Sequence, residues 1–558
     1  MDVRSQRVAR LAPAICIASV VCVAWRITRG VDLSDESYYA IFLHEWFKEG
    51  VSASPFLMLH QTSVLLIYPL AFLYREIAGS TGGLMLFLRC IYLASSTTAA
   101  LVVVRFLRQA GVGSLRWIAG ACLVTFVPYN LPAPSYNTLG LHALLVACAT
   151  FGCAVLRAKA GQRATPCLIL CAVAWAFAIV AYPSLLLPLF VLTLGMLVIV
   201  RPERAFATFY GLAIMIGQAV SWTAVFWILG WQRIARSLDF QGKLNSIFEA
   251  RETPARAFEL LRNNPWFALV LLLSILLALL RKQIPVAATT LANALLVASL
   301  LFLPPTLFVV SHGALIAVAL GGVALLGDLR PRATANAKLF SLLYATSWAA
   351  GLSMAGSSTL GAFKVPVGAA LAAVIAVVMA GERCLAAGKT RLAPVPGIVL
   401  WGVLLVSLYQ SYYGELPLSR PTNRIRITQG AFAGLAATTD DARLIEIAQR
   451  ALRQYERGGD TLTVVGRMPG IYLLSNAPVR ALVPYTLTPF VQPAGRRVTH
   501  DYYARAENRP SLVLLYRDPH FPLIDPFEPD FAKWYGLRER FSTPLGSLEV
   551  FRRTDEPL

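Results

Sequence analysis

The sequence predicts a polytopic α-helical membrane protein of about 13 transmembrane helices, followed by a C-terminal soluble α/β domain. Of the 558 residues, 57% are hydrophobic and only 14% are charged, a balance typical of membrane proteins. Apolar runs of membrane-spanning length recur between Leu11 and Tyr413. Beyond that point 16 of the 30 acidic residues follow, as in an ordinary soluble domain. We therefore divide the chain into a membrane domain, 1–413, and a terminal domain, 414–558.

The first apolar run, 11–27, resembles the core of a signal peptide. No strong small-residue cleavage site follows it, so we expect it to be retained as the first span. The complete set of predicted spans is 11–27, 83–104, 116–131, 138–156, 166–182, 184–200, 206–230, 266–280, 284–301, 306–327, 338–354, 365–381 and 394–413. Two connections between spans are long, namely the first outer loop, 28–82, and a second outer loop, 231–265.

The net charge of +20 is explained by loops between spans, and it does not indicate nucleic-acid binding. With the basic N-terminus in the cytoplasm, the loops on its side hold 16 Lys or Arg and three acids, whereas the intervening outer turns hold one Lys. This asymmetry holds only if the apolar segment 61–79 lies on the outer surface rather than crossing. We therefore expect 13 spans rather than 14, and a terminal domain outside. The Ala- and Arg-rich composition indicates a bacterial inner membrane with that domain in the periplasm.

Acidic residues gather directly after the first span, in the stretch VDLSDESYYAIF (31–42). A carboxylate beside a bilayer is costly unless it is hydrated or functional. The adjacent pair Asp35 and Glu36 suits a general base that acts on a hydroxyl or amine at the membrane surface. The alternative is that Asp32 or Asp35 caps a helix that starts near Glu36, with Ser34 or Asp35 as the N-cap. No acid lies in the middle of a predicted span, which weighs against an ion-coupled transporter.

The motif formed by Asp35, Glu36, Tyr39 and Ala40, placed after the first span and before an amphipathic helix, resembles the GT-C superfamily of membrane glycosyltransferases. That superfamily includes protein O-mannosyltransferase-like and aminoarabinose-transferase-like enzymes. The resemblance implies a sugar donor on a polyprenyl phosphate, and a lipid, glycan or protein acceptor at the outer face. It also implies that Asp35 deprotonates the acceptor, that Glu36 is its neighbour or orients the acceptor, and that the terminal domain binds the acceptor.

The chain departs from that pattern in two places. Many relatives have His-Pro-Pro or Lys-Pro-Pro before the second surface helix, whereas this chain has His60 and Gln61 in LHQTS. Many relatives also have an acid in the second outer loop, where this chain has VPYNLPAPSYNTLG. Tyr136 and Asn137 are candidates there for hydrogen bonds to a sugar or phosphate. Alternatively, Ser135 or Asn137 caps the next helix. No metal ligands are assigned, although a divalent cation is left open.

A departing phosphate needs positive charge or N–H donors around it, and Arg suits this best. We select Arg233, Arg236 and Lys243 from the second long loop, and Lys364 from the turn before the span 365–381. Because no second nucleophile is evident, direct displacement with inversion is the simplest mechanism. The rival hypothesis is a lipid-linked-sugar flippase without transferase activity. The lack of charge at mid-membrane and the large terminal domain count against it.

In the terminal domain, the segment 439–459 predicts an amphipathic helix with Thr439 or Asp440 as its N-cap. The segments 460–467, 509–518 and 547–553 predict strands, and the segment 469–480 predicts a helix or a strand. No nucleotide-binding glycine motif follows any of these strands.

Overall fold

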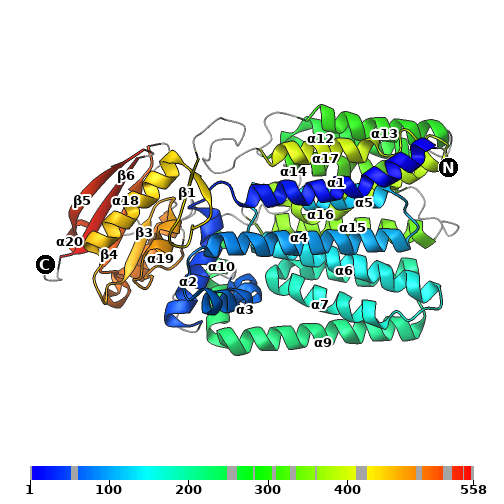
Figure 1. Cartoon of the computed structure of the whole chain (residues 1–558). Helices are drawn as coiled ribbons and strands as arrows, with labels where there is room; N and C mark the ends of the chain where they lie inside the picture. Colours follow the sequence, from blue (N-terminus) through cyan, green and yellow to red (C-terminus); the bar gives the residue numbers. More distant parts are fainter. Residues whose placement is uncertain are drawn as a thin grey trace.

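Two parts make up the computed structural model, a helical bundle and a C-terminal α/β domain (Figure 1). The structure describes residues 3–51, 61–247, 261–280, 283, 285–303, 309–326, 335–358, 361–409, 424–484, 493–519, 531–544 and 546–554. The predicted boundary at residue 414 lies outside these ranges.

Each predicted span coincides with a helix of the bundle, so apolar run length located these elements correctly. Within the described residues, five of the helical segments are long and apolar enough to cross a membrane. The total of 13 spans stays a prediction. The bundle helices are α1 (Val3–Ile27), α4 (Leu84–Gln109), α5 (Leu115–Thr125), α6 (Tyr136–Lys159), α7 (Thr165–Ala181), α8 (Leu186–Gly195), α9 (Arg204–Leu229), α12 (Pro265–Leu280), α13 (Pro285–Leu301), α14 (Val310–Gly321), α15 (Ala335–Gly356), α16 (Val365–Ala386) and α17 (Val395–Ser407).

Three helices lie across the end of the bundle, between it and the C-terminal domain: α2 (Asp35–Glu49), α3 (Gln61–Ala78) and α10 (Trp231–Ile247) (Figure 1). α3 is the segment that we expected to lie on the outer surface, and it is not among the five candidate spans. Its side chains Leu73 and Ile77 are exposed, as suits a helix with one face in the lipid interface.

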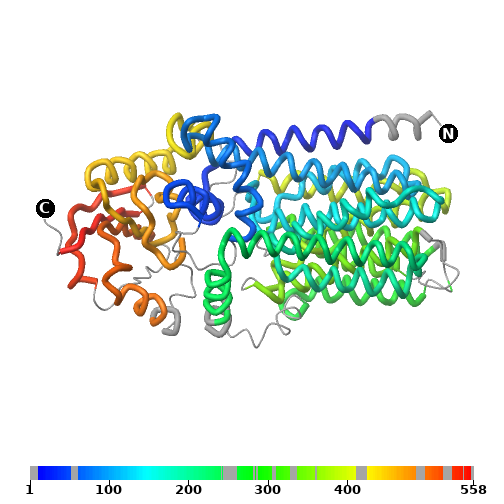
Figure 2. The backbone as a smooth tube through the Cα atoms, turned by 90° about the horizontal axis from the view of Figure 1, so that it is seen from below, coloured from blue at the N-terminus to red at the C-terminus, as the bar shows by residue number. Residues whose placement is uncertain are grey.

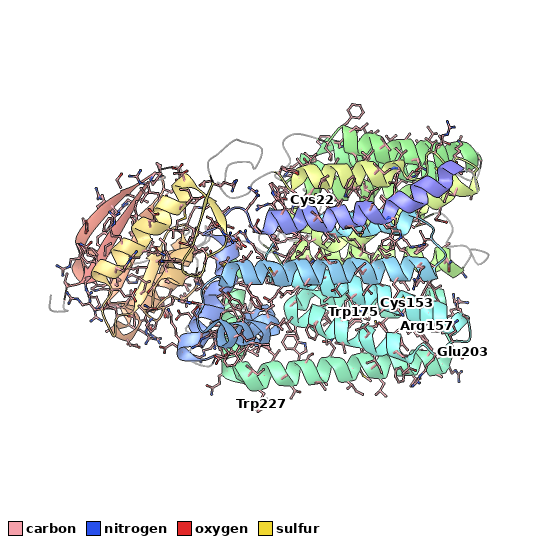
Figure 3. The ribbon with its side chains drawn as sticks, viewed as in Figure 1. Cys22, Cys153, Arg157, Trp175, Glu203 and Trp227 are labelled. Atoms are coloured by element: carbon pink, nitrogen blue, oxygen red, sulfur yellow. The ribbon has the colours of Figure 1, made fainter. Side chains whose placement is uncertain are left out.

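The two ends of the bundle differ in the loops that they carry. Arg157 and Glu203, from loops that we predict to be cytoplasmic, lie at the end away from the C-terminal domain (Figure 3). Trp227 lies near the other end of α9 and is 87% exposed, as is typical of an aromatic residue at a membrane interface. A view from below shows the same division into bundle and domain (Figure 2).

α15 and α16 approach each other closely, because glycines meet at their contact. A Cβ added at Gly368 would overlap the backbone of Gly351. Ser347 reinforces the contact, since its hydroxyl donates to the Gly368 carbonyl at 2.7 Å and accepts from the Ala372 N–H at 2.9 Å. The short helix between α15 and α16, η6 (Gly361–Lys364), is thereby fixed at the end of the bundle where α2 lies.

The C-terminal domain contains a four-stranded mixed sheet in the order β3-β4-β6-β5, in which only β3 and β4 are parallel. Its helix α18 is capped by Thr438, one residue before the predicted Thr439 or Asp440. The strand β5 was missed because three consecutive charged residues, 538–540, occupy its middle. The elements are β1 (Arg424–Arg426), β2 (Ala436–Thr438), α18 (Thr439–Tyr455), β3 (Leu462–Val465), η7 (Pro469–Leu474), α19 (Pro493–Ala504), β4 (Leu512–Arg517), α20 (Phe531–Trp534), β5 (Tyr535–Thr543) and β6 (Gly546–Arg553).

The domain is docked onto the first outer loop through both backbone and side chains. Gly470 N donates to the Leu33 carbonyl at 2.7 Å, and Gly83 N donates to the Gly430 carbonyl at 3.0 Å. Phe42 of α2 is fully buried in one apolar cluster with residues of η7 and α18. At the far end of α2, the ammonium of Lys48 donates to the Ser475 carbonyl at 3.0 Å. The C-terminal domain therefore contacts the chain just before α2, the middle of α2 and its C-terminal end.

Candidate functional site

α2 begins at Asp35, and the residue that caps it is Asp32. The Asp32 carboxylate accepts the backbone N–H of Ser34 at 2.7 Å and that of Glu36 at 3.1 Å. Ser34 occupies the N-cap position but makes no capping bond with its side chain. Two of the predicted alternatives are therefore observed together, since Asp32 caps α2 with its side chain and Ser34 occupies the N-cap position, whereas Asp35 is not the N-cap. Asp35 lies in the first turn and is half-buried.

Asp32 is buried beside two other carboxyl groups. The pKa of Asp32 is raised to about 7, mainly by burial and also by the charges of Asp35 and Glu36, while hydrogen bonds from Ser34 oppose the shift. The folded protein therefore binds a proton here between about pH 4 and pH 7 that the unfolded chain releases. This stabilisation is complete below about pH 4 and is lost as the pH rises through 7.

We expect Asp32→Asn to flatten the pH dependence of stability, because an amide cannot release that proton. The difference in unfolding free energy between variant and wild type should change by at most about 4 kcal/mol across this range. Thermal unfolding in detergent from pH 4.5 to 8 measures it. Parallel curves for the two proteins would contradict the assignment.

Glu36, the second candidate carboxylate, is only 2% exposed and is bound by an arginine. Arg89 of α4 donates from Nε and Nη2 to the two Glu36 oxygens, each at 2.5 Å. Its Nη1 donates to the carbonyls of Ile27 at 2.9 Å and Arg29 at 3.1 Å. This bidentate pair fixes the first turn of α2, and so the backbone of Asp35, against the bundle. The sequence analysis missed Arg89, although a lone Arg in an apolar span was the available signal.

Lys364, from η6, lies at the start of α6. It is 2% exposed, and its ammonium donates to Asn137 Oδ1 at 2.8 Å and to the Tyr136 hydroxyl at 3.0 Å. The rings of Tyr129 and Tyr136 lie 4.8 and 4.7 Å from the ammonium. Asp35 lies within electrostatic range of Lys364. Three predicted substrate-binding residues from two distant segments are thus in direct contact.

Tyr39 completes this group from the α2 side. Its ring centroid lies 6.2 Å from that of Tyr136 and 5.2 Å from that of Tyr38. Burial raises the pKa of Tyr39 well above 10, and Tyr136, Tyr38 and Asp35 raise it further. Tyr39 therefore stays a neutral hydroxyl beside Asp35. The structure brings together Asp35, Tyr39, Tyr136, Asn137 and Lys364, which we call the Asp35 site.

Three aromatic residues of this site were not predicted, namely Tyr129, Tyr182 and His312. Tyr129 and Asn130 have φ values of 58° and 57°, which are strained for residues other than glycine. This turn places the Tyr129 ring between Lys364 and His312, whose ring centroid is 4.5 Å away. The Tyr182 ring lies 5.0 Å from that of Tyr136. Sequence offered only a weak signal, the position of both tyrosines in predicted outer turns.

Among the other predicted residues, Arg233 and Arg236 belong to α10 and Gln61 contacts it, apart from the Asp35 site. Gln61 Nε2 donates to Ser237 Oγ at 3.0 Å, and Arg233 donates to the Val51 carbonyl. Within the described residues no hydrogen bond joins Gln61 or Arg233 to the Asp35 site. Arg236 is exposed. His60 and the Lys243 side chain lie outside the described part of the chain.

Arg233 keeps unused hydrogen-bond donors. Its residue is 5% exposed, and neither Nε nor Nη2 has a partner among the described residues. Burial and then the charge of Arg236 lower the pKa of Arg233 to about 10. At neutral pH it therefore remains a cation, with two buried nitrogens that have no partner among the described residues. The Ser135 side chain, by contrast, caps α6 at Thr138, as one of the predicted alternatives proposed.

The side chains of the Asp35 site include one carboxylate, that of Asp35. Mg²⁺ in proteins is usually bound by one or two carboxylates together with waters and substrate phosphates. Among the described residues, no group of three or more His, Cys, Asp and Glu side chains could hold a metal ion. Glu36 is bound by Arg89, Asp32 caps α2, and the amide oxygen of Asn137 accepts from Lys364.

The fold of the chain matches solved structures of the oligosaccharyltransferase of the archaeon Archaeoglobus fulgidus. The structure with a tethered acceptor peptide containing the NVT sequon is 11% identical, with a TM-score of 0.51 over 98% of this chain and 74% of that one. The complex with an inhibitory peptide and a dolichol-phosphate is 12% identical, with a TM-score of 0.51 over 98% and 75%. The apo form is 11% identical, with a TM-score of 0.50 over 91% and 69%.

No protein-family model and no curated protein sequence matches the chain. The structural match extends over the bundle, the transverse helices and the C-terminal domain, because it covers 98% of the chain. This arrangement of a helical membrane bundle with a terminal domain is the one that the DESYYA motif led us to expect. The chain therefore shares the fold of these archaeal oligosaccharyltransferase structures.

Proposed function

We propose that this protein is a glycosyltransferase that moves a sugar from a polyprenyl-phosphate donor to an acceptor at the outer face of a bacterial inner membrane. The observation that carries the proposal is the Asp35 site. The Asp35 carboxylate acts on the buried Lys364 ammonium, which binds the Tyr136 hydroxyl and Asn137, and the rings of Tyr39 and Tyr182 pack beside the ring of Tyr136. The positive-inside asymmetry of the loops supports the outer face and a periplasmic domain.

Asp35 acts as the general base in this proposal. It takes the proton from the acceptor hydroxyl or amine as that atom attacks the anomeric carbon. The bond between the anomeric carbon and the phosphate oxygen breaks, and its electron pair leaves with the polyprenyl phosphate. Attack from the side opposite the leaving group inverts the anomeric configuration. Glu36 does not touch the acceptor in this scheme, because Arg89 binds both of its oxygens.

The departing phosphate needs donors, and the buried Lys364 ammonium of the Asp35 site is the first candidate, with Arg233 near α10 as the second. The Lys364 ammonium has three N–H donors, of which two have partners within the described residues. Arg233 keeps Nε and Nη2 for an anion. That one matched oligosaccharyltransferase was solved with a dolichol-phosphate supports a lipid-linked donor here. Tyr39, Tyr136 and Asn137 are placed to position the sugar or the phosphate, and Gln61 lies beside the Arg233 cation.

Sugar transfer in membranes of a strain that lacks the gene tests this function. The membranes receive a labelled pool of polyprenyl-phosphate sugars, and chromatography follows label that leaves the lipid carrier. We expect wild-type protein to restore a labelled product that empty membranes do not make. If label only changes leaflet and never leaves its carrier, the protein is a lipid-linked-sugar flippase and the enzyme proposal is wrong.

A further inference from the structure

The Asp35 site already contains a fixed positive charge. Lys364 is buried, held by Asn137 Oδ1 and the Tyr136 hydroxyl, and placed over the faces of two tyrosine rings. The two ring faces and the two oxygen acceptors stabilise the positive charge of the ammonium in the interior of the protein. These contacts fix the ammonium within electrostatic range of Asp35.

A divalent ion near Asp35 would have to compete with this ammonium. The Asn137 amide oxygen, a good ligand for a hard cation, is already bound to Lys364 at 2.8 Å. The two carboxylates nearest to Asp35 in the sequence are engaged, Glu36 with Arg89 and Asp32 with the α2 backbone. Repulsion between the ammonium and a dication in this water-poor site adds to the loss of ligands.

We propose that the Lys364 ammonium is the resident cation of the Asp35 site, and that sugar transfer by this protein needs no divalent metal ion. The ammonium does by charge and N–H donation what a metal ion does by charge, namely stabilise the phosphate oxygen that gains negative charge as the sugar leaves. This inference rests on the proposed function for its catalytic half. Its structural half, the exclusion of a dication, stands independently.

Direct Mn²⁺ binding tests the structural half on the purified full-length protein. Electron paramagnetic resonance measures the Mn²⁺ that remains free at millimolar concentration. Wild type and Asp35→Asn should deplete the free signal equally, because any bound ion lies elsewhere. Binding by wild type that Asp35→Asn removes would overturn the proposal.

A charge exchange makes the test sharper. In Lys364→Glu, a carboxylate replaces the ammonium near Asp35 and the freed Asn137 oxygen, so Asp35-dependent Mn²⁺ binding should appear. The double variant Lys364→Glu/Asp35→Asn should lose it. Lys389→Glu is the matched control, because Lys389 also donates to a neutral oxygen, the Thr290 hydroxyl, and lies outside the site. If Lys364→Glu does not fold, the comparison of Mn²⁺ binding by wild type and Asp35→Asn still tests whether a divalent ion binds near Asp35.

Chelation tests the catalytic half. Transfer by wild-type membranes should be unchanged by EDTA and by added Mn²⁺. Lys364→Met should lower transfer by about 10²-fold or more, and Lys364→Arg should restore part of it, since Arg keeps the charge. Loss of wild-type transfer in EDTA, with recovery on adding Mn²⁺, would refute the inference. Absence of wild-type transfer in every condition would refute the proposed function. The Mn²⁺ binding experiment would still decide whether a divalent ion binds at the Asp35 site.

Discussion

Asp35→Asn is expected to lower sugar transfer by about 10²–10⁴-fold while the protein remains folded, because general base catalysis contributes a factor of this size. Asparagine keeps the shape of the side chain but cannot accept the acceptor's proton. The capping bonds of α2 come from Asp32, and the first turn is held by the Glu36–Arg89 pair, so both remain in the variant. The measurement is the membrane transfer assay at matched expression, with thermal unfolding to verify the fold.

A second helix start in the same chain provides the control. Asp440 lies in the first turn of α18, is exposed, and has no role in the proposed chemistry. Asp440→Asn therefore removes a helix-start carboxylate and should leave transfer unchanged. Equal transfer by Asp35→Asn and wild type would show that Asp35 is not the general base and that DESYYA only begins a helix. The flippase hypothesis would then take precedence over the enzyme.

Arg89→Ala is expected to destabilise the protein by about 3–5 kcal/mol, the cost of leaving a buried carboxylate without its partner. The Glu36 side chain is 1% exposed, and its oxygens accept from Arg89 Nε and Nη2. The carbonyls of Ile27 and Arg29 would also lose a donor. Thermal and denaturant unfolding in detergent measure the loss.

The double variant Glu36→Gln/Arg89→Gln separates the unpaired charge from the lost packing. It removes both charges and keeps polar groups of similar length, so we expect it to recover much of the stability. Transfer should remain reduced, because the first turn of α2 no longer fixes Asp35 against α4. The idea would fail if Arg89→Ala were as stable as wild type. It would equally fail if the double variant were less stable than Arg89→Ala alone.

The sequence by itself determined the membrane elements. Every predicted span became a helix, because the length and apolarity of a run are local properties that a bilayer selects. The strands β3, β4 and β6 were found from short buried runs, whereas β5 was missed because three consecutive charged residues occupy its middle. The DESYYA motif also led us to expect the arrangement of bundle and terminal domain that the chain shares with the oligosaccharyltransferase structures.

Only the tertiary structure decided which side chains meet. Asp35, Tyr136 and Lys364 are separated by more than a hundred residues at each step, and no periodicity links them. Their meeting depends on the close contact of α15 and α16 at Gly351 and Gly368, which fixes η6. It also depends on the strained turn at Tyr129.

The partner of Glu36 illustrates the same limit. Local sequence showed two adjacent carboxylates, and only the packing of α4 against α2 revealed that Arg89 binds one of them. Hydropathy reports the medium that a segment faces, and a motif reports the chemistry that it offers. Contacts between distant segments pair the Glu36 carboxylate with Arg89 and place the Asp35 carboxylate near Lys364. Sequence does not show this, because electrostatic energies between charged groups depend on their distance and burial.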